Sequence, residues 1–325
     1  MMQRFATGMV IVGLLLFAAH GCGSKGPASS SGGNENTIRV EGSDTMVNLA
    51  QAWAEEYNKK FPGVSVQVLG GGSGVGIASL TDGNCDMANA SRKMKDKEKA
   101  RVKQKQGKEP IEHIVGYDAL AVYVHKDNPL DSITVQQLAE IYGEGGTITN
   151  WSQLPGGGDL EITRISRQNN SGTYAYFREA VLGKQREYKL GSIDQSGSKD
   201  VVALVSKTPG AIGYSGMGYA TPEVKMLAVA KTSEEPAVAP VVDTAKDGSY
   251  PITRPLYIYT AGKPEGLLKE YLDWINSLEG QKVILDLGYV PADGLEEASE
   301  GGAVGADPGA EQPAPKSEGD SKGQG

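Results

Sequence analysis

The chain is poor in the side chains that most often carry metal and thiol chemistry. Its 325 residues include three histidines and two cysteines. The histidines, His20, His113 and His125, are scattered along the sequence and show none of the spacings typical of zinc sites. We therefore expect no metal site and no cofactor.

An excess of positive charge is also missing. Lysine and arginine number 32 against 40 acidic residues, so the formal net charge is -8. This balance argues against a nucleic-acid-binding protein that works through a broad basic surface. It does not exclude a small anion as ligand, because the local field of a pocket can differ in sign from that of the whole protein.

The apolar run near the N-terminus is shorter than a membrane span requires. This run, 9–19, follows the single charge of Arg4 and leads to Cys22, a pattern that predicts a secretory signal at 1–21. The stretch AHGC (19–22) resembles the lipobox of bacterial lipoproteins, which implies that Cys22 is lipidated and becomes the new N-terminus. An uncleaved anchor helix would leave the protein on the same side of the membrane. We therefore expect an exported protein, anchored by lipid on the outer side of the cytoplasmic membrane or in the periplasm.

Cys85 is the other cysteine, and lipidation of Cys22 would leave it without a disulfide partner. It begins the apolar stretch CDMANA. We expect Cys85 to be a small buried apolar side chain rather than a nucleophile.

Two segments of biased composition flank the predicted folded body. The Gly/Ser-rich stretch 22–36 suits a flexible tether, and 294–325, rich in Gly, Glu, Ala and Pro, predicts a disordered acidic tail. Between them, strand-like and helix-like patterns alternate over 37–293. This alternation predicts an α/β fold with largely parallel sheets, in which ligands bind where strands end and helices begin.

Individual patterns support this organisation. Val64, Val66 and Val68 alternate as in a strand, whereas the apolar residues of 49–61 recur at helical spacing. The strongly charged stretch 92–109 predicts a solvated helix without a ligand.

Three segments share one design, in which a strand leads through a turn rich in Gly, Ser and Thr into a helix. They are VEGSDTMVNLA (40–50), VLGGGSGVGIASL (68–80) and ISRQNNSGTYAYF (165–177). The first backbone N–H groups of a helix lack internal partners and carry partial positive charge, and Gly lets the backbone approach a ligand. Such termini bind small anions.

An ordinary capping role competes with this interpretation. Ser43, Asp44, Ser73 and Ser171 could each satisfy their own helix, since Ser and Asp are common N-caps. Three such termini in one chain, one of them carrying Arg167, favour an oxyanion site.

Motifs for catalysis fail in detail. The stretch GGGSGVG (70–76) has no lysine after its glycines, so it is not a nucleotide-binding P-loop. Val75 and Met217 stand where a nucleophile elbow needs glycine. His113 and His125 have no supporting context for a serine hydrolase. We therefore do not expect an enzyme.

Several segments together resemble the PstS family, the phosphate-binding proteins of bacterial phosphate ABC importers. The resemblance runs in order over 37–291 through GSDTMVNLAQAWAEEY, GGGSGVG, SRQNNSGTYAYF, PGAIGY, YPITRPLYIY and EGQKVILDLGYVP. It implies a two-lobed periplasmic-binding-protein fold of the α/β class, with mixed sheets and two hinge crossings, near Tyr117 and over 250–255. The first lobe is then discontinuous (37–117 and 251–293), and the second is 118–250.

The same resemblance implies a function and a set of partners. The protein would bind inorganic phosphate between its lobes, outside the cytoplasm, and deliver it to the permease subunits of an ABC importer. It would act as a monomer, without a cofactor. The residues implied to bind phosphate are Ser43, Asp44, Thr45, Ser73, Ser91, Arg167, Ser171, Gly172 and Thr173.

One departure from the family pattern bears on selectivity. Ser91 aligns with an aspartate that accepts the proton of phosphate in well-known members. A buried carboxylate accepts a hydrogen bond from protonated phosphate and repels sulfate, which carries no proton near neutral pH. We hypothesise that Asp44 supplies this acceptor and that Arg92 keeps it ionised; a plain helix cap is the alternative for Asp44. Two alternatives to phosphate transport remain. One is a receptor for another tetrahedral oxyanion such as sulfate, and the other is a secreted hydrolase or phosphatase.

The residues around the Ser-Gly-Thr motif carry two further expectations. Arg167 would bind the anion, or would instead form a salt bridge with a neighbouring acid such as Glu179. Tyr174, Tyr176 and Phe177 are expected to anchor the helix to its own lobe.

Overall fold

The computed structural model describes residues 36–292. The predicted signal, Cys22, nearly all of the predicted tether and the predicted acidic tail lie outside the described residues. Within 36–292, no helix is both long enough and apolar enough to cross a membrane.

The first lobe is built on a mixed sheet. Strands β1 and β2 are parallel, β1 is also parallel to β3, and β10 runs antiparallel to both β3 and β4. A short last strand adds antiparallel to β4. The strands are β1 (Thr37–Gly42), β2 (Ser65–Leu69), β3 (Met87–Ala90), β4 (Pro110–His125), β10 (Thr253–Ala261) and β11 (Val290–Pro291).

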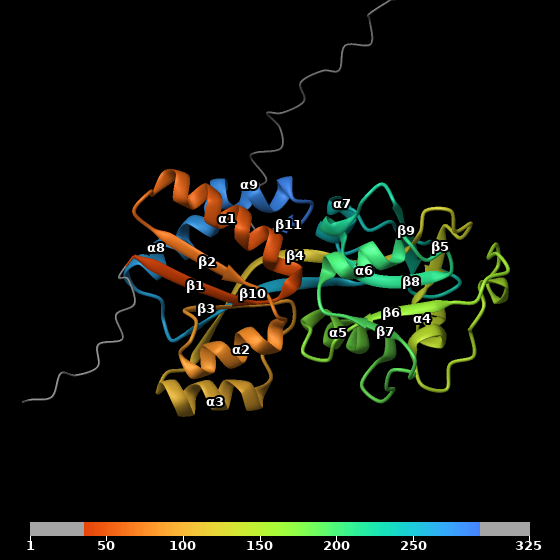
Figure 1. The fold of residues 1–325 in the computed structure, drawn as a ribbon, viewed down its shortest axis with the longest axis horizontal. Helices are drawn as coiled ribbons and strands as arrows, with labels where there is room; N and C mark the ends of the chain where they lie inside the picture. The colour runs from red at the N-terminus through yellow and green to blue at the C-terminus, as the bar shows by residue number, and fades with distance from the viewer. Residues whose placement is uncertain (1–35, 293–325) are drawn as a thin grey trace, which may run out of the picture. The chain divides into compact units, whose positions relative to one another are not determined.

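Helices cover both faces of this sheet (Figure 1). Helices α1, α8 and α9 bury Trp53, Tyr271 and Ile284 in one apolar cluster, and α2 and α3 bury Ile77 and Val102 in another. The helices are α1 (Val47–Lys60), α2 (Ser73–Asp82), α3 (Asp96–Gln106), α8 (Gly266–Ile275) and α9 (Leu278–Asp286), with the 3-10 turn η1 (Asp44–Met46) before α1.

The second lobe has its own mixed sheet and a single large core. Strand β4 pairs antiparallel with β8 and β9, β6 is parallel to β8 and β7, and β5 is parallel to β9. Its elements are β5 (Ser132–Thr134), α4 (Val135–Tyr142), η2 (Trp151–Gln153), β6 (Thr163–Arg167), α5 (Gly172–Phe177), the π-helix η3 (Arg178–Leu182), β7 (Ile193–Gln195), α6 (Ser198–Val205), β8 (Ala211–Gly216), η4 (Met217–Tyr219), β9 (Val224–Ala230) and α7 (Val242–Lys246).

Two chain segments connect the lobes. Strand β4 pairs with β10 up to Ala119 and with β8 from Leu120 onward, so one strand belongs to both sheets. The return crossing leads into β10, where the backbone N–H of Leu120 donates to the carbonyl of Ile252. The predicted two-lobed fold with two hinge crossings and a discontinuous first lobe is thus confirmed. The residue boundaries of the lobes stay a prediction.

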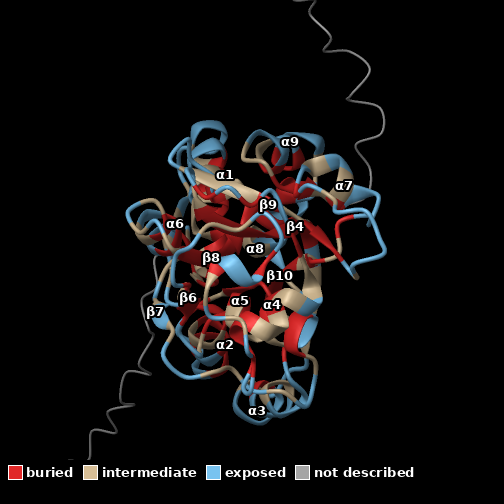
Figure 2. Ribbon diagram, turned by 90° about the vertical axis from the view of Figure 1, so that its right-hand side faces the viewer, coloured by how far each residue is buried: buried red, intermediate tan, exposed pale blue. Residues whose placement is uncertain are grey.

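The alternation of strands and helices predicted largely parallel sheets, whereas both sheets are mixed, because β4 and β10 run antiparallel to their neighbours. Other local patterns form the elements expected from them. Helix α1 buries Leu49, Trp53 and Tyr57 on one face, and α3 buries only Val102, as expected for a solvated helix. Buried residues gather along the strands and on the sides of helices that face them (Figure 2). Cys85 is 4% exposed, and burial raises the pKa of its thiol to about 12, which fits the predicted inert side chain.

Candidate functional site

The three predicted strand–turn–helix segments have the expected form. Turn η1 begins at Asp44 directly after β1, α2 begins at Ser73 after β2, and Ser171 is the N-cap of α5 after β6. The first backbone N–H groups of each terminus lie beyond the end of a strand and have no partner within their own helix.

In the first lobe, these termini bring buried serine hydroxyls together. Ser43 Oγ donates to Ser91 Oγ at 3.0 Å, and Ser73 Oγ lies 3.4 Å from Ser91 Oγ. The backbone N–H of Ser91 donates to Ser73 Oγ at 3.0 Å. Ser91 therefore lies beside two other predicted site residues, with a hydroxyl that can both donate and accept.

The second lobe meets this group through the N-terminus of α5. Thr45 Oγ1 and Thr173 Oγ1 lie 2.9 Å apart across the lobes. A Cβ at Gly172 would lie 2.2 Å from Ser73 Oγ and 2.5 Å from Ser91 Oγ, so only glycine fits there. We call the hydroxyls of Ser43, Thr45, Ser73, Ser91 and Thr173 the polar cluster.

Ser171 contributes to the site through the helix rather than through a bond to the cluster. Its Oγ accepts from the backbone N–H groups of Thr173 and Tyr174 at 3.1 and 3.4 Å. It is thus a genuine N-cap, and it lies beside Gly172 and Thr173 at the lobe boundary. Ser171 can therefore cap α5 and still lie at the predicted site.

Arg167 is almost fully buried, at 1% exposure, and it pairs with a carboxylate of the other lobe. Its Nη2 donates to Asp44 Oδ2 at 3.1 Å, and its Nη1 donates to Ser198 Oγ at 3.0 Å. Burial lowers the pKa of Arg167, an effect that Asp44 opposes, and the guanidinium stays charged at neutral pH. The alternative of a salt bridge with a neighbouring acid is thus present, but the acid is Asp44 and not Glu179.

Asp44 is therefore held from two sides. Its Oδ1 accepts from the backbone N–H of Gly71 at 2.9 Å, and its Oδ2 accepts from Arg167. Each carboxylate oxygen can accept a second hydrogen bond. The alternative of a plain helix cap is therefore wrong for Asp44, because Ser43 is the N-cap residue of this turn and no side-chain capping bond forms.

Arg92 does not support Asp44, contrary to our hypothesis. Its Nη1 and Nη2 donate to the two carboxylate oxygens of Glu98, both at 2.8 Å. Glu98 also accepts from the backbone N–H of Lys95 at the start of α3. Arg92 turns to this helix start because the fork of a guanidinium matches a carboxylate that is already fixed.

A second buried arginine, Arg254, was not assigned a role from the sequence. Its Nη1 donates to Thr173 Oγ1 at 3.0 Å, and its Nη2 donates to Thr45 Oγ1 at 3.2 Å. Its Nε and Nη2 donate to Asp118 Oδ2. Arg254 lies within the quoted segment YPITRPLYIY, but its antiparallel register opposite Asp118 cannot be found from that pattern.

The aromatic residues of α5 contact two parts of the molecule, their own lobe and the start of β10. Phe177 stacks on Tyr214 with ring centroids 3.9 Å apart, and Tyr174 stacks on Tyr188 at 4.4 Å, so both anchor the helix to its own lobe as expected. Tyr176 does not. Its hydroxyl donates to the carbonyl of Thr253 at the start of β10, because this face of α5 lies against the hinge.

The loops at the cluster also form direct bonds between the lobes. The backbone N–H of Gly74 donates to the carbonyl of Asn170 at 3.0 Å, and Asn170 Nδ2 donates to the carbonyl of Gly71 at 3.0 Å. A Cβ at Gly72, where φ is +95°, would lie 2.9 Å from the carbonyl oxygen of Asn170. The lobes are therefore closed on each other at the glycine loop.

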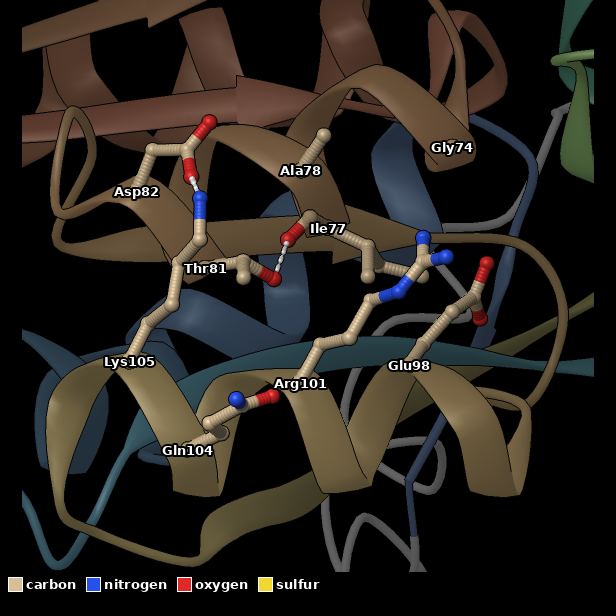
Figure 3. Close-up of a pocket in the computed structure, with 9 residues that line it drawn as sticks. All are labelled: Gly74, Ile77, Ala78, Thr81, Asp82, Glu98, Arg101, Gln104 and Lys105. Carbon is tan, nitrogen blue, oxygen red and sulfur yellow. Dashed lines mark hydrogen bonds and ion pairs between the residues drawn. The ribbon is translucent and has the colours of Figure 1, made fainter.

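A separate groove lies between α2 and α3 (Figure 3). Its polar groups bond to one another: Thr81 Oγ1 donates to the carbonyl of Ile77, and Lys105 pairs with Asp82. The groove shares only Gly74 with the loops that contact the other lobe. It is not part of the polar cluster.

The chemistry of the cluster suits a small oxyanion. Two arginines, Arg167 and Arg254, are each matched by a carboxylate, Asp44 and Asp118, so hydroxyl and backbone N–H donors dominate the local field. Among residues 36–292, no group of three or more His, Cys, Asp or Glu side chains could hold a metal ion. The cluster also contains none of the described histidines, so a hydroxyl nucleophile would lack its usual base.

Comparisons with known proteins give a consistent result. A family model described as a PBP superfamily domain matches residues 27–279. The chain is 37% identical over 277 residues to the phosphate-binding protein PstS of Pseudomonas aeruginosa, which covers 81% of this chain and 84% of that protein. It is 30% identical over 292 residues to the phosphate-binding protein PstS of Bacillus subtilis, covering 87% of this chain and 92% of that one.

Solved structures agree with these relatives. A phosphate ABC transporter substrate-binding protein with bound phosphate from Clostridium perfringens has a TM-score of 0.71 and 30% identity, and covers 79% of this chain and 100% of its own. An ABC-type phosphate transport receptor from Vibrio cholerae has a TM-score of 0.62 and 27% identity, and covers 78% of this chain and 100% of its own.

Proposed function

The chain belongs to the PstS family of phosphate-binding proteins, within the PBP superfamily, and from this premise we propose how it works. It binds inorganic phosphate outside the cytoplasm and delivers it to an ABC importer. Proteins of this family bind and transfer a substrate without transforming it, so the chain is not an enzyme.

One observation supports the placement of the ligand. The residues predicted to bind phosphate come from both lobes and meet in a single buried group, which includes a guanidinium, several hydroxyls and the N-terminus of α5. Many directed donors in a closed, water-poor site can replace the hydration shell of an anion. The proposed phosphate ligands are Ser43, Asp44, Thr45, Ser73, Ser91, Arg167, Ser171, Gly172 and Thr173.

In the proposed complex, the hydroxyls turn from one another to the anion. Thr45 and Thr173 already face each other across the lobes, so an anion between them would be bound by both lobes at once. Binding would therefore stabilise the closed arrangement, because the ligand gains contacts there that an open form does not offer.

Asp44 is the proposed acceptor for the proton of phosphate. Asp118 is occupied by Arg254 and by the backbone N–H of Met217, whereas Asp44 lies in the first loop, next to Ser43 and Thr45, and is paired with Arg167. The aspartate position of the family holds Ser91, and Asp44 is the carboxylate that we propose in its place. The ratio of phosphate affinity to sulfate affinity reports on this role.

A calorimetric titration of the full-length protein with phosphate, sulfate and arsenate tests the function. We expect strong heat with phosphate and arsenate, whose protonated forms offer a hydrogen bond to Asp44, and weak or no heat with sulfate. Equal binding of sulfate would favour a general oxyanion receptor. No heat with any of the three would rule out the transport role.

Cellular placement rests on the sequence and on the extracytoplasmic role of the family. We propose that 1–21 is removed, that Cys22 carries a lipid anchor, and that a monomer presents phosphate to the permease subunits. Mass spectrometry of the N-terminal peptide from membranes would show the lipid on Cys22. An unmodified N-terminus that retains Met1 would rule out this processing.

A further inference from the structure

Arg254 joins the hinge to both lobes of the proposed site. It lies opposite Asp118 in the antiparallel pairing of β10 with β4, next to the point where β4 passes from one sheet to the other. Both side chains are fully buried. Arg254 is not among the proposed phosphate ligands, yet its guanidinium contacts the polar cluster.

The N–H donors of the guanidinium bond to one carboxylate, which we call its anchor, and to two threonine hydroxyls. Nε and Nη2 donate to Asp118 Oδ2 at 3.1 and 2.8 Å. Nη1 donates to Thr173 Oγ1 at 3.0 Å, and Nη2 also donates to Thr45 Oγ1 at 3.2 Å. One planar group thus connects the hinge, the first lobe and the second lobe.

The anchor itself is tightly held. Asp118 Oδ1 accepts from the backbone N–H of Met217, and a Cβ at Gly216 would lie 2.9 Å from Asp118 Oδ2. The guanidinium also lies over the ring of Tyr176, with Cζ of Arg254 5.8 Å from the ring centroid. The orientation of the guanidinium is therefore fixed by its surroundings.

This orientation decides where the threonine protons can point. A guanidinium offers donors and no acceptor, whereas a hydroxyl has one proton and two lone pairs. Thr45 and Thr173 accept from Arg254 with a lone pair, so neither proton is used on the arginine. Their mutual contact at 2.9 Å uses one proton at most. Both protons can therefore turn to an anion that separates the two oxygens.

We propose that Arg254 is a positioning residue of the phosphate site, which fixes the hydroxyls of Thr45 and Thr173 as donors toward the anion and ties this orientation to closure of the lobes. The inference rests on the proposed phosphate binding. The fork reaches Thr45 of the first lobe and Thr173 of the second only when the two lie side by side. A lysine keeps the charge but concentrates it at one nitrogen, so it cannot span Asp118 and both threonines in the same way.

The test uses Arg254→Lys in the full-length protein, with phosphate binding measured by calorimetry. We expect a thermal midpoint close to that of the parent, because the cation still pairs with Asp118, and phosphate affinity weaker by about tenfold. Arg39→Lys is the matched control, since Arg39 also forms a forked pair with a carboxylate, Asp86, but on the surface of the first lobe. The control should bind phosphate as the parent does.

A second comparison separates positioning from mere charge or packing. In a Thr173→Val background, one of the two hydroxyls that Arg254 orients is gone, so Arg254→Lys should now weaken phosphate binding only about threefold rather than about tenfold. An undiminished cost would overturn the proposal. The proposal would also be overturned if Arg254→Lys alone bound phosphate with an affinity within threefold of that of the parent.

If Arg254→Lys fails to fold, a double variant takes its place in the test. Arg254→Met combined with Asp118→Leu removes the buried pair together, which leaves no unpaired charge. It should show the same loss of affinity and the same dependence on Thr173. A parent protein that binds no phosphate would instead reject the proposed function, which keeps the two failures distinct.

Discussion

At the scale of single residues, the site pairs each buried cation with a carboxylate. Arg167 faces Asp44, and Arg254 faces Asp118. An anion held here would therefore depend on hydroxyl and backbone N–H dipoles rather than on surplus positive charge. This matches the acidic balance of the whole chain, since a small site can favour an anion without a basic surface.

Asp44 carries the residue-scale prediction. Changing Asp44→Asn removes the charge that should repel sulfate, while one oxygen remains to accept from Gly71. Leaving a buried charge unpaired costs roughly 3–5 kcal/mol, and Asp44 is partly exposed, so we expect the phosphate-to-sulfate affinity ratio to fall by at least about tenfold.

Calorimetry with both anions measures this ratio, and Asp86→Asn, a change at a surface carboxylate of the same lobe, is the control. A ratio that stays unchanged in Asp44→Asn would place the discrimination elsewhere in the site.

At the scale of elements, helix starts do most of the positioning. Asp44 and Ser171 follow the C-terminal ends of β1 and β6 and stand at the beginnings of helical segments, where backbone N–H groups lack partners in the preceding turn. The same logic orders the start of α3, away from the polar cluster. There Glu98 accepts from the backbone N–H of Lys95 and from both nitrogens of the Arg92 fork.

Glu98→Gln tests this helix start. Burial raises the pKa of Glu98, but the hydrogen bonds from Arg92 and Lys95 outweigh it, so the pKa lies below its ordinary value of 4.5. The stabilisation is therefore complete above pH 4.5 and is lost as the pH falls through the folded-state pKa. We expect Glu98→Gln to lose about 1–2 kcal/mol of unfolding free energy at pH 7, and less in acid.

Urea unfolding at pH 7 and below pH 4 measures the difference between Glu98→Gln and the parent. Glu56→Gln, which removes a surface pair with Lys59 on α1, serves as the control and should change stability by less than about 0.5 kcal/mol. A loss at Glu98 that is equal at both pH values would mean that its charge is not the cause.

At the scale of the whole molecule, closure depends on bonds between loops that are far apart in sequence. Asn170 reaches the glycine loop of the first lobe twice, through its carbonyl and its side-chain amide. The apparent affinity of a ligand scales with the population of the form that binds it. Weaker bonds between Asn170 and the glycine loop should therefore weaken phosphate binding.

Asn170→Ala removes the side-chain bond to Gly71 and leaves the backbone bond to Gly74. The loss of one such bond is worth about 1 kcal/mol, which corresponds to roughly fivefold in affinity. Calorimetry should show this decrease, and small-angle scattering without phosphate should show a larger radius of gyration. Asn169→Ala, an exposed neighbour, should match the parent in both measurements. Identical scattering and affinity for Asn170→Ala and the parent would show that this bond does not govern closure.

Much of this molecule follows from local sequence. Alternation in β2, helical spacing in α1 and the Ser-Gly-Thr start of α5 are short-range patterns, because side-chain period and capping are set within a few residues. The resemblance to the family then predicted that these elements form two lobes, and it pointed to residues that the fold brings together.

Pairings across long distances in the chain were decided by tertiary structure. Asp44 meets Arg167, Arg92 turns to Glu98, and Arg254 reaches two threonines through a register that no local pattern encodes. A charged side chain takes the partner that folding brings within reach and that desolvation makes necessary, and both depend on how the strands align and how the lobes close. The sequence determined which groups could bind an anion, and the closed fold determined how they are paired.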